Sequence, residues 1–166
     1  DHLTGVFYWP AINLLLWGLT GSYFESQAQQ ASGLVFAIIS GIVFWLITER
    51  ANFDITFSVL QELWDKNLIN IFATPLTFAE WVVSFFVITI IKTIIGFLFA
   101  LVLAYILYHA YIFSYGFLIL PFGALFMMTG WWLGCFISGI ILRYGTKVQA
   151  LAWTIPAILT PFSAIY

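Results

Sequence analysis

The stretch from Gln61 to Glu80, "QELWDKNLINIFATPLTFAE", separates two long apolar segments and decides the arrangement of helices. It holds four of the chain's charged residues, although only 7% of all residues are charged. On a 3.6-residue period most of its apolar side chains share one face and most of its polar side chains share the other. This pattern predicts a short amphipathic helix over 60–73.

The end of this helix and the start of the next are also marked. Pro75 disfavours the α conformation at Thr74, so the amphipathic helix is expected to stop there. Thr77 and Glu80 have the spacing of a capping box and stand directly before the next apolar run. The stretch therefore predicts a long helix, a short amphipathic helix, a proline turn and a capped second long helix.

The composition is that of an integral membrane protein. The chain has 166 residues, of which 63% are hydrophobic, whereas roughly a quarter of the residues in a soluble domain are charged. Long apolar runs, without the two-residue alternation of a membrane barrel, indicate helices. The net charge of -2 indicates no nucleic-acid partner. Cys135, the single cysteine, cannot form an intrachain disulfide.

The fold class expected is an all-α, polytopic helical bundle that forms one transmembrane domain over 1–166. Five spans are predicted, with Pro121 as a kink in the fourth, at 3–24, 33–58, 78–108, 111–142 and 148–166. Because the chain begins and ends almost inside spans, we expect both ends to be truncated.

The basic residues indicate the orientation of these spans. Arg50 stands in the less apolar end of the second span, Lys66 follows that span, and Arg143 and Lys147 follow the fourth, whereas the connections after the first and third hold no Lys or Arg. Cytoplasmic loops collect basic residues. The Gln61–Glu80 stretch and the "RYGTK" turn are therefore expected together on the cytoplasmic side. Taken alone, the pattern leaves two roles open for the short helix, an interfacial connector or a docking surface for a soluble partner.

Four segments resemble ABC-2 type transporter permeases. "WDKNLINIFATPLTFAE" resembles their signature region, in which a short cytoplasmic helix precedes an N-x-x-N-x-F-x-x-P-L-x-x-x-E stretch. "FYWPAINLLLWG" resembles their first span, "GWWLGCFISGIILRYGTKVQALAW" their fourth span and turn, and "PFSAIY" the end of their fifth. The resemblance implies a type V exporter-like fold with six spans, five of them visible here.

The resemblance also implies partners and a place in the cell. Such a subunit pairs with a second permease copy, as a homodimer or heterodimer, in the lipid of a prokaryotic cytoplasmic (inner) membrane, and exports a substrate. A separate ABC ATPase carries ATP and Mg. This chain has no GxxxxGK[ST] loop, so it is expected to be no enzyme and to hold no cofactor of its own.

The short helix would then be the coupling helix that meets the ATPase, while Leu63, Trp64, Ile71 and Phe72 anchor it to its own bundle. The turn after the fourth span would be a second contact. The residues expected at this ATPase-coupling surface are Glu62, Trp64, Asp65, Lys66, Asn67, Asn70, Arg143 and Lys147.

Other residues permit more than one interpretation. Gly130 and Gly134 form a GxxxG pair, a helix-packing pattern that also arises by chance. Three roles are open for Lys92, which lies inside the third span: contact with substrate, pairing with an acidic residue of the second span, or extension of its ammonium group toward water. Glu49, Arg50 and Asp54 are interpreted as an ion-paired cytoplasmic end of the second span, with a proton relay as the alternative.

Two rival functions remain. An ion-coupled secondary transporter or channel would use intramembrane Lys92 and the charges of the second span and need no ATPase. A non-transporting membrane scaffold would show no substrate-dependent activity.

Overall fold

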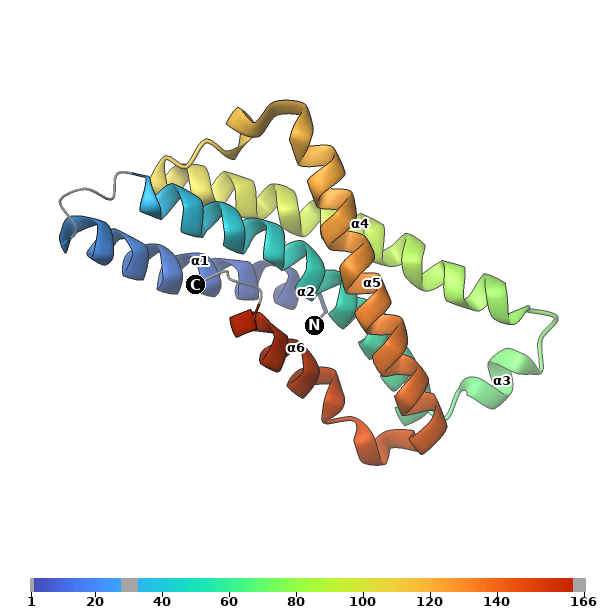
Figure 1. Ribbon diagram of the computed structural model, residues 1–166. Helices are drawn as coiled ribbons and strands as arrows, with labels where there is room; N and C mark the ends of the chain where they lie inside the picture. The colour runs from blue at the N-terminus through green and yellow to red at the C-terminus, as the bar shows by residue number, and fades with distance from the viewer. Residues whose placement is uncertain (1, 28–32, 163–166) are drawn as a thin grey trace.

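The computed structural model describes residues 2–27 and 33–162, and all the regular elements in these ranges are helices (Figure 1). The elements in chain order are α1 His2–Gln27, α2 Leu34–Trp64, α3 Leu68–Phe72, α4 Phe78–Tyr108, η1 Ile112–Leu118, α5 Ile119–Tyr144, η2 Gly145–Val148 and α6 Leu151–Phe162.

Among the described residues, three helical segments are long and apolar enough to cross a membrane. They are Val35–Trp64, Phe78–Tyr108 and Ile112–Val148. They correspond to the predicted second, third and fourth spans. The chain is thus an all-helical bundle of the kind that membrane proteins form.

The predicted first and fifth spans are not among these three. α1 has 26 residues, but polar residues such as Asn13 and Glu25 make it less apolar than the others. α6 has 12 residues, about 18 Å at 1.5 Å per residue, which is short of a hydrocarbon core of about 30 Å. The end of the predicted fifth span, 163–166, lies outside the described residues.

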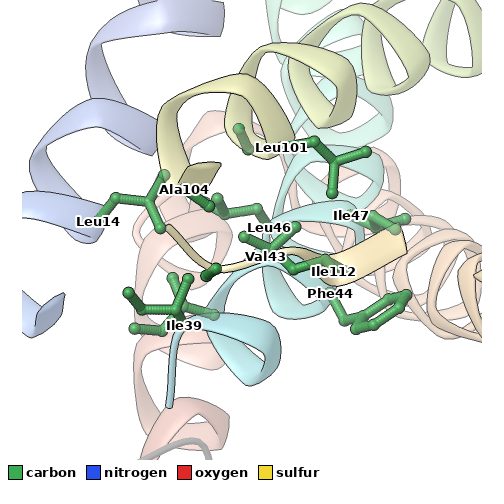
Figure 2. Packing of buried hydrophobic residues seen from close by; sticks show 12 residues of the cluster. Leu14, Ile39, Val43, Phe44, Leu46, Ile47, Leu101, Ala104 and Ile112 are labelled. Carbon is green, nitrogen blue, oxygen red and sulfur yellow. The ribbon is translucent and has the colours of Figure 1, made fainter. Parts of the chain in front are cut away.

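α2 is the central helix. It contacts α5, α4 and α1, and Figure 1 shows α1, α2 and α4 running side by side while α5 crosses α2 at an angle. The main core lies where α1, α2, α4 and η1 meet, and Figure 2 shows Leu14, Val43, Leu101 and Ile112 converging there. A second cluster, of Leu60, Ile137, Ile141 and Ala152, lies near the C-terminal end of α2.

Contacts between residues far apart in sequence give the helix directions. The ring of Phe7 lies 4.8 Å from that of Phe99, and further along both helices the Tyr108 hydroxyl donates a 3.3 Å hydrogen bond to the Leu15 carbonyl. α1 and α4 are therefore parallel to each other. Gly21 of α1 meets Val35 near the start of α2, so α2 runs in the opposite direction.

The predicted kink at Pro121 is wrong. α5 begins at Ile119, so Pro121 lies in its first turn, where backbone N–H groups have no partner within the helix and a proline removes no bond. The break lies earlier, at Gly116, whose φ of 56° and ψ of -132° are not helical. A glycine adopts such a conformation without a Cβ clash.

The single helix predicted over 60–73 is divided in two. Residues 60–64 continue α2, and α3 starts again at Leu68. Lys66 lies between them in the left-handed conformation, with a φ of 52°. The Lys66 N–H donates to Leu63 O at 3.2 Å and the Asn67 N–H donates to Glu62 O at 3.0 Å. This bond pair is a Schellman motif with lysine where glycine is usual, and it ends α2.

The capping box predicted at the start of α4 is confirmed. The Thr77 hydroxyl accepts a hydrogen bond from the Glu80 N–H, and the Glu80 carboxylate accepts one from the Thr77 N–H at 2.8 Å. These two bonds satisfy backbone donors that the first turn leaves free. The start of α4 is therefore set by two nearby residues, Thr77 and Glu80.

Candidate functional site

Two chain connections meet at one end of the bundle. Trp64, the last residue of α2, donates a 3.0 Å hydrogen bond from its indole Nε1 to Oε1 of Gln149, in the connection between α5 and α6. Leu63 packs with Val148 and Leu151 on the second apolar cluster. The polar stretch after α2 and the turn after α5 therefore share this end, as the basic residues predict.

The polar side chains after α2 form a small network of their own. Asn67 Nδ2 donates to Glu62 Oε2 at 3.0 Å, and Asn70 Nδ2 donates to Asn67 Oδ1 at 3.3 Å. Asp65 and Lys66 are exposed beside it. The network holds the Glu62 carboxylate at the junction of α2 and α3, and the two exposed charges remain accessible to a partner.

The basic residues at the end of α5 and in the turn after it are exposed as well. The Arg143 guanidinium lies 5.5 Å from the centre of the Tyr144 ring, and Lys147 is in the 3₁₀ turn η2. Arg143 is in the last turn of α5 and Lys147 follows that helix, whose start, at Ile119, is at the opposite end of the bundle (Figure 1). The junction thus combines exposed charges of both signs.

The expected apolar anchors of the short helix differ in the structure. Leu63 is packed, but α3 has no buried residue, and Ile69 is 82% exposed. Phe72 reaches α4 through the ring of Trp81, at 5.7 Å between centroids. Figure 1 shows α3 standing apart from the bundle, below the start of α4. The predicted anchoring of α3 in the bundle is therefore reduced to the contact of Phe72 with the start of α4, and Ile71 is not buried.

A second group of charges lies inside the bundle. Arg50 Nε donates a 3.1 Å hydrogen bond to Asp54 Oδ2, and Lys92 Nζ lies 3.6 Å from Asp54 Oδ1. Asp54 is 9% exposed. The sequence analysis expected Glu49, Arg50 and Asp54 to form an ion-paired end of a span. Arg50 and Asp54 do pair, but Glu49 makes no ion pair within the described residues, and α2 continues past all three to Trp64. Lys92 adopts one of its predicted alternatives, pairing with an acidic residue of α2.

A cavity of about 250 Å³ adjoins these charges. Glu49, at the midpoint of α2, and Arg50 line it together with four aromatic rings. α1, α2, α4 and α6 contribute to it, and its lining residues are Trp9, Pro10, Leu46, Ile47, Glu49, Arg50, Phe53, Thr93, Gly96, Phe97, Trp153, Pro156, Ala157 and Thr160.

Two polar groups at this cavity lack a partner. No hydrogen bond or ion pair within 2–27 and 33–162 involves the carboxylate of Glu49, which is half-buried. The Thr93 hydroxyl is buried and likewise makes no hydrogen bond to the described residues. Buried polar groups are normally satisfied, so the cavity is chemically equipped to receive a polar ligand group.

Gly130 and Gly134 lie against α2. A Cβ on Gly130 would come 2.5 Å from the Thr48 carbonyl oxygen, and one on Gly134 would come 3.1 Å from the Asn52 carbonyl oxygen. The hydroxyl of Thr48 donates a 2.9 Å hydrogen bond to the Phe126 carbonyl of α5. The glycines therefore permit the close approach of α2 and α5, which is the role that small residues have in membrane bundles.

Sequence reasoning did not identify several of these residues. Gln149 and Thr93 have no pattern that distinguishes them from other polar residues near apolar runs. Gly18 was also missed, although a Cβ there would clash with the Tyr108 ring. Glu49 could be identified from the sequence, because an acidic residue in the middle of a membrane-crossing helix is energetically costly and indicates a functional site.

These features define a helical bundle with three helices able to cross a membrane, a polar junction at one end and a charged cavity inside. In the ranges that the structure describes, no group of three or more His, Cys, Asp or Glu residues is placed to hold a metal ion. No protein-family model, curated protein or solved structure matches the chain.

Proposed function

We propose that this chain is the permease subunit of an ATP-driven ABC-2 type exporter in a prokaryotic inner membrane. The junction of α2, α3 and η2 is the observation that carries the proposal. It brings the exposed charges of Asp65, Lys66, Arg143 and Lys147 to one end of the bundle, where Trp64 and Gln149 link the two connections by a hydrogen bond.

The fold supplies a mechanical route from this junction to the cavity. α2 is one continuous helix from Leu34 to Trp64, and Glu49 and Arg50 of its middle turns line the cavity. An ATPase bound at the junction would move the end of α2, and helices transmit displacement because their backbone hydrogen bonds make them stiff. Since α2 also contacts α1, α4 and α5, such a movement would repack the walls of the cavity.

The proposal assigns the energy source to a partner. ATP and Mg bind to a separate ATPase subunit, and two permease copies enclose the transport path. The exposed charges at the junction provide charge-assisted hydrogen bonds to the ATPase, which give specificity in addition to affinity. The exposed Ile69 side chain of α3 adds an apolar contact.

The test is association of the full-length protein with an ATPase of its host. We expect Glu62→Ala combined with Asp65→Ala to abolish co-purification of the ATPase from detergent. Glu25→Gln is the matched control, since it removes a carboxylate at the opposite end of the bundle. Unchanged association of the double variant, or no associated ATPase under any nucleotide condition, would contradict the proposal.

An ion-coupled carrier is the second candidate. The ion pair between Lys92 and Asp54 favours it, because charges in the interior of a membrane bundle often belong to ion or proton pathways. This function predicts uptake or release by vesicles that contain the protein without an ATPase, driven by an ion gradient and lost in Lys92→Met. An ATP-dependent exporter would show no such gradient-driven transport.

A further inference from the structure

We propose that the cavity binds a zwitterionic amphiphile, with Glu49 holding its ammonium group and Arg50 holding its anionic group. That this molecule is the transported substrate rests on the proposed function, because only a permease would carry it. Binding itself is measurable without an ATPase.

The charges around the cavity balance only when they are counted together. Asp54 neutralises one of its two cationic partners, Arg50 and Lys92, so these three groups carry one excess positive charge. The Glu49 carboxylate supplies the opposing negative charge without touching either cation in the structure. The site is therefore neutral overall but holds separated charges.

A ligand that is itself neutral overall but carries separated positive and negative charges fits such a site best. A cation bound at Glu49 would leave the excess positive charge uncompensated, and an anion bound at Arg50 would do the same to the Glu49 carboxylate. Net charge in the interior of a membrane protein is costly. A zwitterion pairs with both groups and leaves the total charge at zero.

The two anchoring residues have the donors and acceptors that this requires. Within the described chain, the Arg50 side chain donates one hydrogen bond, from Nε to Asp54, so its terminal nitrogens remain for a phosphate or carboxylate. The two oxygens of Glu49 remain for an ammonium group. Thr93, whose hydroxyl has no partner among the described residues, lines the same cavity.

The walls of the cavity explain why the ligand is amphiphilic. Trp9, Phe53, Phe97 and Trp153 line it, and aromatic faces attract ammonium groups while their area favours apolar chains. Its volume of about 250 Å³ exceeds the ~150 Å³ of a cavity that holds benzene. This space accommodates a compact head group, with the apolar body extending along the aromatic walls.

The experiment measures binding of four probes to the full-length protein in a nonionic detergent, by native mass spectrometry below their micellar concentrations. Dodecylphosphocholine is the zwitterion, dodecyltrimethylammonium the cation and dodecyl phosphate the anion. Glycerophosphocholine has the same head group without the chain. We expect dodecylphosphocholine to bind at least about tenfold more tightly than the other three, since each charged hydrogen bond contributes a factor of that order.

Variants separate the two anchors from nonspecific uptake. Glu49→Gln is expected to weaken dodecylphosphocholine about tenfold or more and Glu49→Asp to restore part of the affinity. Glu25→Gln, which removes a carboxylate that bonds backbone N–H groups of Gly33 and Val35, is expected to change nothing. Because Glu49 has no partner to lose within the described chain, its replacement leaves folding intact, which circular dichroism checks.

Three results would overturn the inference: equal binding of all charged probes, tighter binding of the cation or the anion, or unchanged affinity in Glu49→Gln. Binding of glycerophosphocholine as tight as that of dodecylphosphocholine would contradict the amphiphilic part of the inference, because the head group alone would then account for the affinity. Failure of the proposed function would look different, because the protein would then bind dodecylphosphocholine through Glu49 yet associate with no ATPase.

Discussion

The Lys92 ammonium group on α4 lies 3.6 Å from Oδ1 of Asp54 on α2, whose Oδ2 accepts a 3.1 Å hydrogen bond from Arg50. One buried carboxylate therefore serves two cations from two helices. The pair fixes the register of α4 against α2 beside the cavity, because a slip of either helix would leave a charge without a partner in the bundle.

Replacing Asp54 by Asn is expected to destabilise the protein by about 2 kcal/mol. The cost of breaking a buried ion pair is reduced here because Arg50 and Lys92 are partly exposed. The two cations would also repel each other once the carboxylate is gone. The midpoint of thermal unfolding in detergent, followed by circular dichroism, measures the loss.

Lys92→Met serves as the comparison for Asp54→Asn. It leaves Asp54 paired with Arg50, so we expect a smaller loss of stability. Combining Asp54→Asn with Lys92→Met should recover part of the stability that Asp54→Asn alone removes. A loss in the double variant equal to the sum of the two single losses would show that the residues do not interact.

Adding a methyl group at Gly130 is expected to separate α2 from α5. The new Cβ of Gly130→Ala would stand 2.5 Å from the Thr48 carbonyl oxygen and 2.7 Å from the Ala51 Cβ. Overpacking of this kind costs about 1–3 kcal/mol. Gly134→Ala, with its nearest contact at 3.1 Å, should cost less.

Gly139→Ala is the matched control on the same helix, because nothing lies within 4 Å of its added Cβ. Unfolding midpoints of the three variants should fall in the order Gly139→Ala, Gly134→Ala, Gly130→Ala, with Gly130→Ala the lowest. Equal midpoints for Gly130→Ala and Gly139→Ala would mean that α2 and α5 do not make this contact.

Lys66→Gly is expected to stabilise the end of α2. Lys66 has a φ of 52°, which costs a residue with a Cβ roughly 1–2 kcal/mol and costs glycine nothing of this kind. Part of that gain is offset by the greater chain entropy of glycine in the unfolded state. Hydrogen exchange at the Lys66 and Asn67 amides, which close the Schellman motif, should slow in Lys66→Gly.

Lys66→Val tests the same point with the opposite sign, because a β-branched residue tolerates the left-handed region poorly. Its amides at 66 and 67 should exchange faster than those of the natural protein. Faster exchange in both variants would indicate that the lysine charge, and not the backbone conformation, holds this junction.

Trp64→Phe and Gln149→Leu should each lower stability by about 0.5 to 1 kcal/mol, the usual net contribution of a neutral hydrogen bond near solvent. The bond joins Trp64 to Gln149 across the two connections, so the double variant should lose less than the sum. If the losses add fully, the bond contributes nothing. Under the proposed function, both variants should also weaken association with the ATPase.

Local features of the helix ends were predictable because they depend on neighbours in sequence. The Thr77 capping box needs only Thr77 and Glu80, three residues apart, and the structure has it as predicted. The division of the 60–73 helix at Lys66 was not predictable. A lysine has no preference for the left-handed conformation, so nothing in the sequence marks Lys66 as a helix end. The amphipathic period runs on through this position, although the backbone ends α2 there.

The sequence by itself determined the apolar, all-helical character of the chain, the start of α4 and, among the five spans it predicted, the three segments that are long and apolar enough to cross a membrane in the described structure. These properties follow from composition, period and adjacent residues. Only the tertiary structure decided that Glu49, Thr93 and Trp153 surround one cavity, that Asp54 serves two cations and that Gln149 meets Trp64. Such contacts join residues on different helices, and helix packing, which no local pattern encodes, sets the distance between them.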